Sequence, residues 1–235
     1  MYELSVIIPV LDEEYHLERL IKALKLQRGV KLDIIVADAG SQDNSRIIAK
    51  KYGVKVVKGG LPSVGRNNGT KVAKYRQILF LDADVIFPRG FVVKCLRDMK
   101  KRKLNVASVL TKPDSKKIVD RLLFAVWNIW VVLTQKIYPH APGYCIFSNK
   151  AVHKKIGGFN PRLYICDDAN YVAKASKIAK FGIIQTFVTT SVRRLDTEGR
   201  LEMSKKMVLC GVYRIVKGEP IGNKFKYHFG VHKKR

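Results

Sequence analysis

Hydrophobic positions follow two patterns along residues 1–85. Short apolar runs are typical of strands buried on both faces of a parallel sheet, and they predict strands at 4–10, 32–37, 54–57 and 78–81. Apolar residues at i, i+3, i+4 and i+7 predict a helix that begins near residue 12 and buries Leu17, Leu20, Ile21 and Leu24. Two more helices are expected to begin near residues 41 and 63. This alternation indicates right-handed βαβ units and a parallel sheet.

The alternation is less regular after Val85. There the pattern predicts strands at 106–110, 143–147 and 183–188, and helices at 91–101, 114–137, 168–180 and 200–216. We therefore expect an α/β fold with a Rossmann-type, mixed but mainly parallel sheet flanked by helices. The chain is expected to form a single domain with a basic C-terminal tail.

The strand at 78–81 is followed by Asp82-Ala83-Asp84, which places two carboxylates one residue apart. Side chains at i and i+2 of an extended segment point the same way, so Asp82 and Asp84 can converge on one object. Two anions this close repel each other unless a cation lies between them. A hard divalent ion that carries substrate phosphates would fit, although an aspartate in this position can also cap the following helix.

Acidic residues follow other predicted strands as well: Asp12 with Glu13, Asp38, and further on Asp167 with Asp168. Parallel strands send their carboxyl ends to one edge of the sheet, where open α/β sheets bind ligands. The sequence therefore predicts one acidic cleft that uses a metal ion and handles phosphates.

The formal charge of +26 is unevenly distributed. Residues 1–84 hold 14 basic and 10 acidic side chains, whereas residues 85–235 hold 31 and 9. A basic second half indicates a polyanionic partner, which could be a nucleic acid, an anionic membrane surface or a phosphorylated substrate.

The four cysteines, Cys95, Cys145, Cys166 and Cys210, show no paired spacing. We therefore expect neither a zinc site nor a disulfide framework, and we infer a reducing compartment. The chain enters its first predicted strand within a few residues of Met1, so no signal peptide is expected and a cytoplasmic location is predicted.

A series of ordered motifs resembles the inverting family-2 glycosyltransferases of the GT-A fold, over roughly residues 4–195. They correspond to an opening strand, a nucleotide-binding turn, an Ala-Arg-Asn-x-Gly helix start, a metal motif, and a Gly-Gly-Phe turn followed by an acidic pair. In this sequence they are Val6-Ile7-Ile8-Pro9 with Glu13, Val36–Asp43, Gly65-Arg66-Asn67-Asn68-Gly69, Leu81-Asp82-Ala83-Asp84, and Ile156-Gly157-Gly158-Phe159 with Asp167-Asp168.

The resemblance implies a nucleotide-sugar donor, a divalent cofactor (Mn²⁺ or Mg²⁺) and inversion. It implies that Asp84, together with Asp82, binds the metal ion. It also implies that a carboxylate is the general base, for which we choose Asp168, with Asp167 as the reserve. The residues expected at the donor are Pro9, Val10, Glu13, Asp38, Gly65, Arg66, Asp82 and Ala83.

Four basic residues have open roles. Arg66 could add positive potential to the donor site, or it could pair with Asp38. Arg193 and Arg194 could reach a phosphate after the last strand, and His140 could approach the metal or the acceptor. Solvated surface arginines and a loop histidine without a ligand are the competing interpretations.

On this basis, residues 1–198 form the GT-A glycosyltransferase domain, with a nucleotide-sugar half at 1–87 and an acceptor half at 88–198. Residues 199–235 form a basic helix and tail.

The sequence departs from the family's motifs at two positions. Ala39 replaces the second Asp of the family's nucleotide turn, and Asp167 replaces the Glu of its acidic pair. No Gln-x-x-Arg-Trp motif follows the last strand, so the sequence favours transfer of a single sugar over processive synthesis.

Two other functions were weighed. A nucleic-acid-binding protein would account for the charge, but the basic residues are not interleaved with aromatic ones in a motif, so nucleic acid is not the expected partner. A nucleotidyltransferase would favour a Gly-rich loop after the first strand, where Val10–Glu14 stands instead.

The most apolar stretch, residues 118–133, is too short and too polar for a span of about 20 residues. It could be a buried helix, or an interfacial helix with Trp127 and Trp130 at headgroup depth. With the basic second half, it leads us to predict peripheral binding to the anionic inner face of a membrane and a lipid-phosphate-linked or otherwise anionic acceptor.

Overall fold

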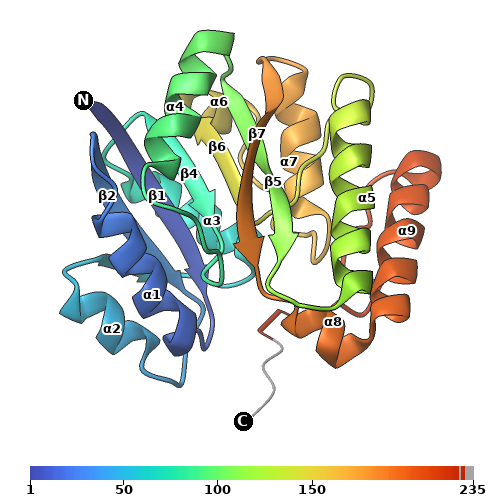
Figure 1. Ribbon diagram of the computed structural model, residues 1–235, viewed down its shortest axis with the longest axis horizontal. Coiled ribbons are helices and arrows are strands. Elements are labelled where there is room, and N and C mark those ends of the chain that lie inside the picture. The colour runs from blue at the N-terminus through green and yellow to red at the C-terminus, as the bar shows by residue number, and fades with distance from the viewer. Residues whose placement is uncertain (228, 231–235) are drawn as a thin grey trace.

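The computed structural model describes residues 1–227, 229 and 230. A seven-stranded sheet in the order β3-β2-β1-β4-β6-β5-β7 forms its centre (Figure 1). The strands are β1 (Tyr2–Val10), β2 (Val30–Asp38), β3 (Lys55–Lys58), β4 (Gln77–Leu81), β5 (Val106–Pro113), β6 (Cys145–Asn149) and β7 (Phe181–Thr190). β1 runs parallel to β2 and β4, β2 to β3, and β5 to β7, whereas β6 runs antiparallel to both of its neighbours. The expected mixed, mainly parallel α/β sheet is confirmed.

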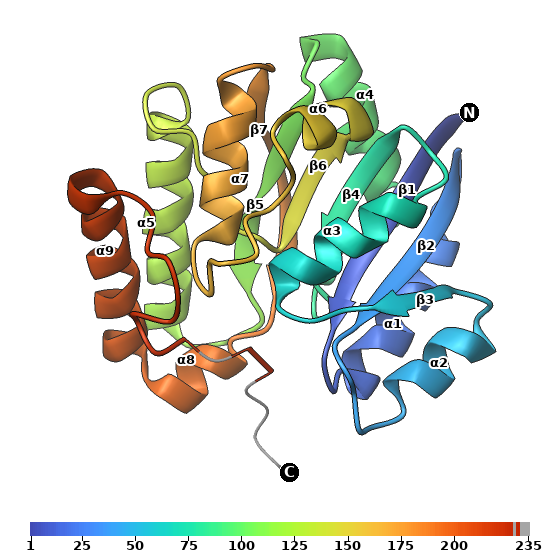
Figure 2. The same ribbon diagram turned by 180° about the vertical axis from the view of Figure 1, so that it is seen from behind.

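Helices cover both faces of the sheet (Figures 1 and 2). They are α1 (Glu14–Lys25), α2 (Ser45–Lys51), α3 (Pro62–Val72), α4 (Phe91–Arg102), α5 (Ile118–Thr134), α6 (Lys150–Lys155), α7 (Asp167–Ser176), α8 (Arg193–Glu198) and α9 (Arg200–Lys217). The predicted helix at 114–137 is shorter at both ends, and α6 and α8 were not predicted. The division at residue 198 into a domain and a tail stays a prediction.

Alternating side chains of the strands build two cores. Val6 and Ile8 of β1 point to one face, where they join the buried leucines of α1 and the apolar side of α4. Ile7 points to the other face, with Phe80 of β4 and with Phe159, Tyr171 and Val172 of the α6–α7 region. The period of two is what a strand buried on both faces requires.

Glycines let α3 approach this second face. A Cβ at Gly69 would lie 2.4 Å from Ile7 Cγ2, and one at Gly65 would lie 3.2 Å from the Cβ of Ala37. The close approach carries the neighbouring Arg66 toward the carboxyl edge of β4.

Candidate active site

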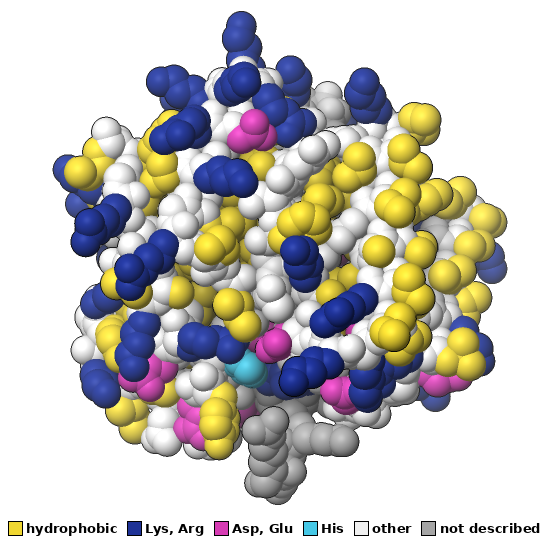
Figure 3. Space-filling view, in the orientation of Figure 1, with side chains coloured by type: hydrophobic (Ala, Val, Ile, Leu, Met, Phe, Trp, Pro, Cys, Tyr) yellow, Lys and Arg dark blue, Asp and Glu magenta, His cyan; other side chains and the backbone are white. Residues whose placement is uncertain are grey.

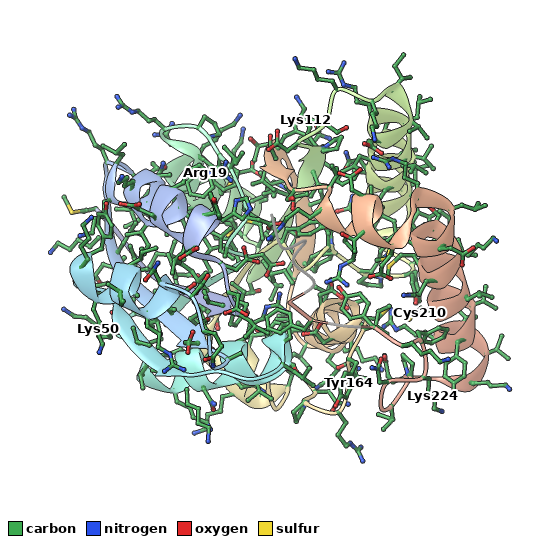
Figure 4. The ribbon with its side chains drawn as sticks, turned by 90° about the horizontal axis from the view of Figure 1, so that it is seen from below. Arg19, Lys50, Lys112, Tyr164, Cys210 and Lys224 are labelled. Atoms are coloured by element: carbon green, nitrogen blue, oxygen red, sulfur yellow. The ribbon has the colours of Figure 1, made fainter. Side chains whose placement is uncertain are left out.

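The carboxyl ends of β1, β2, β4, β5 and β7 lie along one edge of the sheet, the lower edge in Figure 1. Because β6 is antiparallel, its first residues meet the end of β4: Leu81 pairs with Cys145, and the amide of Asp82 donates to the carbonyl of Tyr144 at 3.0 Å. Figure 4 looks onto this edge from below, with Arg19 of α1 on one side and Cys210 of α9 on the other. The predicted gathering of strand ends is thus present.

Arg66 is the buried centre of the acidic cluster. Its guanidinium donates to Asp82 Oδ1 at 2.8 Å, to Asp167 Oδ2 at 2.9 Å and to the carbonyl of Gly143 at 3.3 Å, and it lies 5.2 Å from the ring centre of Phe159. It therefore joins the acid after β4 to the acid that opens α7, 101 residues away in the chain. The suggested pairing of Arg66 with Asp38 is wrong.

Asp168 lies next to this pair, in the first turn of α7. Its Oδ1 accepts from the amide of Ala169 at 2.7 Å, and its Oδ2 is close enough to Gly143 that a Cβ there would lie 3.0 Å away. Burial, followed by the negative charge of Asp167, raises the pKa of Asp168 to about 6. A carboxylate with a raised pKa that is still ionised at neutral pH can accept a proton from a hydroxyl group.

Asp82 has a raised pKa as well. Burial raises it to about 6 although Arg66 opposes the shift, and the charge of Asp84 adds to it. Two groups near Arg66, Asp82 and Asp168, thus titrate well above the ordinary range of an aspartate. Such perturbed groups in one cluster are typical of functional sites.

A second arginine, Arg193, contacts the acids Glu13 and Asp84 of the cluster. Arg193 Nη2 donates to both oxygens of Glu13, at 2.8 and 3.0 Å, and lies 3.5 Å from Asp84 Oδ2. Burial raises the pKa of Asp84 and that of Glu13. The bridge between Ile86 and Thr189 brings the end of β7, and with it Arg193, beside the segment after β4.

The fit of a divalent ion can be judged from this arrangement. Among the described residues, no group of three or more His, Cys, Asp and Glu side chains is placed to hold an ion together. Asp84 and Glu13 nevertheless face one cation, the guanidinium of Arg193, and they offer the hard oxygen ligands that Mg²⁺ and Mn²⁺ prefer. Because such ions are often held by one or two carboxylates plus substrate phosphates, the residues fit a metal that binds together with the donor.

Asp38 lies further along the edge, at the end of β2. Its carboxylate accepts from the amides of Gly40 and Ser41 and from Arg46 Nε at 2.5 Å. Burial would raise the pKa of Asp38, but the bonds from Ser41 and Arg46 lower it overall. Sequence reasoning missed Arg46, although a basic residue in the first turn of the helix after the motif could have indicated it.

The turn that contains Asp38 is linked to the segment after β1. The amide of Asp12 donates to Ser41 Oγ and that of Glu13 to Ser45 Oγ, each at 3.0 Å, and the amide of Gln42 donates to Asp12 Oδ1 at 2.7 Å. These bonds fix the two donor-side loops relative to each other.

Some predicted site residues serve mainly the fold. The side chains of Val10 and Ala83 are part of the core, so only their backbone could face a ligand. Pro9 is buried in β1, and Gly65 makes room for α3. His140 lies among the rings of Trp127, Trp130 and Tyr138, and its Nδ1–H donates to the carbonyl of Tyr138 at 2.6 Å. Within the part of the chain that the structure describes, these contacts do not support a metal or acceptor role for it.

The C-terminal segment also reaches the site. The guanidinium of Arg194 lies 4.1 Å from the ring centre of Tyr227, and Arg194 Nη1 donates to Glu198 at 3.1 Å. Burial, and then the charges of Asp168 and Asp167, raise the pKa of Tyr227, so it stays a neutral phenol beside the cluster. No sequence pattern pointed to Tyr227, because the tail carries no core periodicity.

Comparisons with known proteins agree with this geometry. The family model described as glycosyl transferase family 2 matches residues 5–156. The 4,4'-diaponeurosporenoate glycosyltransferase of Staphylococcus aureus (strain MRSA252) is 27% identical over 175 residues, which cover 66% of this chain and 46% of the relative. The chain thus spans less than half the length of that curated relative.

Solved structures share the fold. The mannosyltransferase PcManGT from Pyrobaculum calidifontis, in complex with GDP-Man and Mn²⁺, has a TM-score of 0.75 at 15% identity, covering 95% of this chain and 66% of that one. S. aureus TarS 1–349, in complex with UDP-GlcNAc, has a TM-score of 0.67 at 18% identity, covering 90% and 66%. The expected GT-A-like architecture is confirmed.

Proposed function

The chain belongs to glycosyl transferase family 2, and we propose that it transfers a single sugar from a nucleotide-diphospho-sugar to an acceptor hydroxyl, with inversion at the anomeric carbon. The observation that carries this proposal is the convergence of Asp82, Asp167 and Asp168 around Arg66, with Asp84 beside Arg193, at the carboxyl edge of the sheet. The nucleic-acid-binding and nucleotidyltransferase alternatives do not account for this family membership.

Asp168 acts as the general base. It takes the proton of the acceptor hydroxyl while that oxygen forms a bond to the anomeric carbon, and the bond from this carbon to the phosphate oxygen breaks on the opposite face. The electron pair of the broken bond leaves with the nucleoside diphosphate. Arg66 is a positioning residue in this scheme, because it holds Asp167, the neighbour of the base, against Asp82 on the donor side.

The donor lies over the ends of β1, β2 and β4. Asp38 and the linked loops after β1 and β2 contact the nucleoside, and Asp84 with Glu13 would hold a divalent ion at the diphosphate. Such an ion, when bound, stabilises the negative charge that develops on the leaving nucleoside diphosphate. Arg193 supplies a cation at the same place, where it can turn from Glu13 to a phosphate oxygen.

Two neighbours of this fold support a nucleotide-sugar donor but differ in base and sugar, since one was solved with GDP-Man and the other with UDP-GlcNAc. The replacement of an Asp by Ala39 in the nucleotide turn does not favour either base. The S. aureus relative is named a 4,4'-diaponeurosporenoate glycosyltransferase, and the ending of that name denotes a carboxylate. For this chain we propose a lipid-phosphate-linked acceptor with a free hydroxyl group, because its second half is strongly basic.

A transfer assay tests the function. The protein is incubated with Mn²⁺ and a panel of UDP- and GDP-sugars, and release of the nucleoside diphosphate is measured for the wild type and for Asp168→Asn. The proposal expects release from at least one donor that depends on Asp168. Release that is the same for both proteins, or no release from any donor with water or an added polyprenyl-phosphate-linked sugar as acceptor, would contradict it.

A further inference from the structure

Helix α5 presents a stripe of exposed apolar side chains. Ile118, Leu122, Val126, Ile129 and Leu133 follow helical spacing and are each 60–73% exposed. The side chains of this helix that are fully buried are Asp120 and Val131. A helix of a soluble fold normally turns its apolar side toward the core, so this outward stripe calls for a partner.

Helix α9 adds a second stripe beside the first. Its exposed apolar residues are 53–71% exposed and comprise Leu201, Val208, Leu209, Val212, Ile215 and Val216, whereas Cys210 faces inward and is buried. Arg200 binds Asp120 through two bonds, at 2.6 and 3.0 Å, and so fixes α9 against α5. The two helices lie side by side at the β7 end of the molecule, and Figure 3 shows hydrophobic side chains gathered over this region. We call these two stripes the α5/α9 face.

The face is bordered by basic residues. Arg121 is exposed on α5, Lys116, Lys117 and Lys136 flank this helix, and Lys205 and Lys217 are exposed on α9. Three acids nearby are paired: Asp120 binds Arg200, Asp196 pairs with Lys117 at 3.6 Å, and Glu202 pairs with Lys205 at 3.1 Å. Lys116, Arg121, Lys136 and Lys217 add to these pairs, so the border carries a net positive charge.

This charge decides between two occupants. A second copy of the chain would bring the same basic border against itself in a two-fold interface, and like charges would face each other. An anionic bilayer complements both features, because its headgroups neutralise lysines and its acyl boundary accepts the apolar stripes. Among the described residues, no helix is long and apolar enough to cross a membrane.

We propose that the α5/α9 face docks in the interface of an anionic membrane, with both helices parallel to its plane. Trp127 and Trp130, 37% and 51% exposed, stand on the flank of α5, where the amphipathic indole rings favour headgroup depth. The two helices together bury more apolar surface in the bilayer than α5 could alone.

The docking proposal also concerns the acceptor, and this part of it rests on the proposed function. On its inner side, Cys210 of α9 contacts Cys166, the residue directly before Asp167 and Asp168. On the other side of α5, a cavity of about 480 Å³ is lined by Lys112, Arg121, Phe124 and Phe187. Docking in this orientation places an anionic, lipid-anchored acceptor within reach of Lys112 and Arg121.

Vesicle binding tests the proposal without donor or acceptor. The protein is mixed with phosphatidylglycerol or phosphatidylcholine vesicles at low and moderate salt, and both co-sedimentation and tryptophan emission are recorded. Both tryptophans of the chain lie beside the face, so their emission reports on it. We expect a blue shift and at least tenfold stronger binding to the anionic vesicles, weakened by salt.

Matched variants locate the contact. Val126→Glu with Val212→Glu should lower binding at least tenfold, whereas Ile47→Glu, at an exposed apolar position on α2, should not change it. Lys116→Gln with Lys136→Gln should weaken binding to anionic vesicles, and Lys31→Gln with Lys50→Gln should weaken it less. Equal binding to both lipids, none to either, or an emission that shifts with protein concentration in the absence of vesicles would overturn the proposal.

The same measurement separates this inference from the enzymatic one. Asp168→Asn should bind anionic vesicles like the wild type, because Asp168 lies outside the face. Vesicle binding without any sugar transfer would refute the proposed function and leave the docking intact. Sugar transfer without vesicle binding would refute the docking and leave the proposed function intact.

Discussion

Arg193 and Glu13 lie 180 residues apart in the chain, yet one guanidinium nitrogen of Arg193 donates to both carboxylate oxygens of Glu13, at 2.8 and 3.0 Å. The same nitrogen lies 3.5 Å from Asp84 Oδ2. A cation thus stands between the two carboxylates that we assign to the metal side of the donor site. The arginine and a divalent ion would compete for the same oxygens.

This competition gives the first prediction. Arg193→Gln should raise the affinity for Mn²⁺ in the absence of donor by about threefold to fivefold, since a partly exposed ion pair contributes up to about 1 kcal/mol. Calorimetric titration with Mn²⁺ measures the change. The neighbouring Arg194→Gln is the control, because Arg194 binds Glu198 and should leave Mn²⁺ affinity unchanged. Weaker Mn²⁺ binding by Arg193→Gln would show that the arginine does not occupy the metal position.

The second prediction concerns Asp84 itself. Asp84→Ala should reduce transfer by about 10³-fold and remove its dependence on a divalent ion, because the charge of the leaving group loses its main stabilisation. The fold should persist, since the segment after β4 contributes little to the core through this carboxylate. Glu3→Ala, at an exposed acid of the same sheet, should behave as the wild type in activity and thermal unfolding. Full turnover by a folded Asp84→Ala protein in excess chelator would refute the metal assignment.

The third prediction assigns the base. Asp168→Asn should keep donor affinity and lower the rate of transfer by about 10²–10⁴-fold, because the amide cannot accept a proton. The raised pKa sets the pH dependence: Asp168 is protonated below about pH 6, so the rate should fall roughly tenfold per pH unit below that value and level off above it. This acidic limb should vanish in Asp168→Asn. If Asp167→Asn proves the more damaging change, the base is Asp167.

The sequence predicted the sheet and the edge where the acids meet because both follow from local patterns. Strand burial shows in runs such as 78–81, and parallel strands must end on one side. Which acidic and basic side chains of the site pair with each other did not follow from local patterns. Arg66 could have met Asp38 as well as Asp167, and which of them it meets depends on how α7 packs against β6, which no local pattern encodes.

The same limit explains what was missed on α9. Its apolar residues at helical spacing predicted a helix, but periodicity alone does not say whether the apolar side faces a core or the outside. Gly65 was expected at the donor, and its packing role was missed for a similar reason. A glycine in a binding motif can face a ligand or admit a neighbouring strand, and in this chain it admits Ala37 and β2.

The fourth prediction tests that packing role at the neighbouring glycine. Gly69→Ala should destabilise the fold by about 1–3 kcal/mol, because its Cβ would lie 2.4 Å from Ile7 Cγ2 in a filled core. Thermal unfolding should shift down by roughly 2–4 °C per kcal/mol. Gly211→Ala is the matched control, since nothing lies within 4 Å of its Cβ on α9, and it should be neutral or stabilising. Adding Ile7→Ala to Gly69→Ala should recover part of the loss if the clash is the cause.

The last prediction concerns Cys166 and Cys210, whose sulfurs lie 2.7 Å apart although the spacing of the cysteines indicated no pairing. Both are free thiols, and the contact with Cys166 lowers the pKa of Cys210, which makes Cys210 the sulfur that forms a thiolate first. An azo oxidant such as diamide should take two hydrogens and two electrons from the pair, leaving a disulfide and a hydrazine. Intact mass should fall by two hydrogens in the wild type and not in Cys210→Ser.

Cys95 should not react, because burial raises the pKa of its thiol to about 12. The new bond would close a loop between α7 and α9 and should stabilise the fold by roughly 3–4 kcal/mol on the chain-entropy estimate, so thermal unfolding should shift up on oxidation and return on reduction. Since Cys166 directly precedes the acidic pair, the crosslink also ties the α5/α9 face to the base. If oxidation leaves the mass unchanged, or lowers the unfolding temperature, the two sulfurs are not positioned as the fold places them.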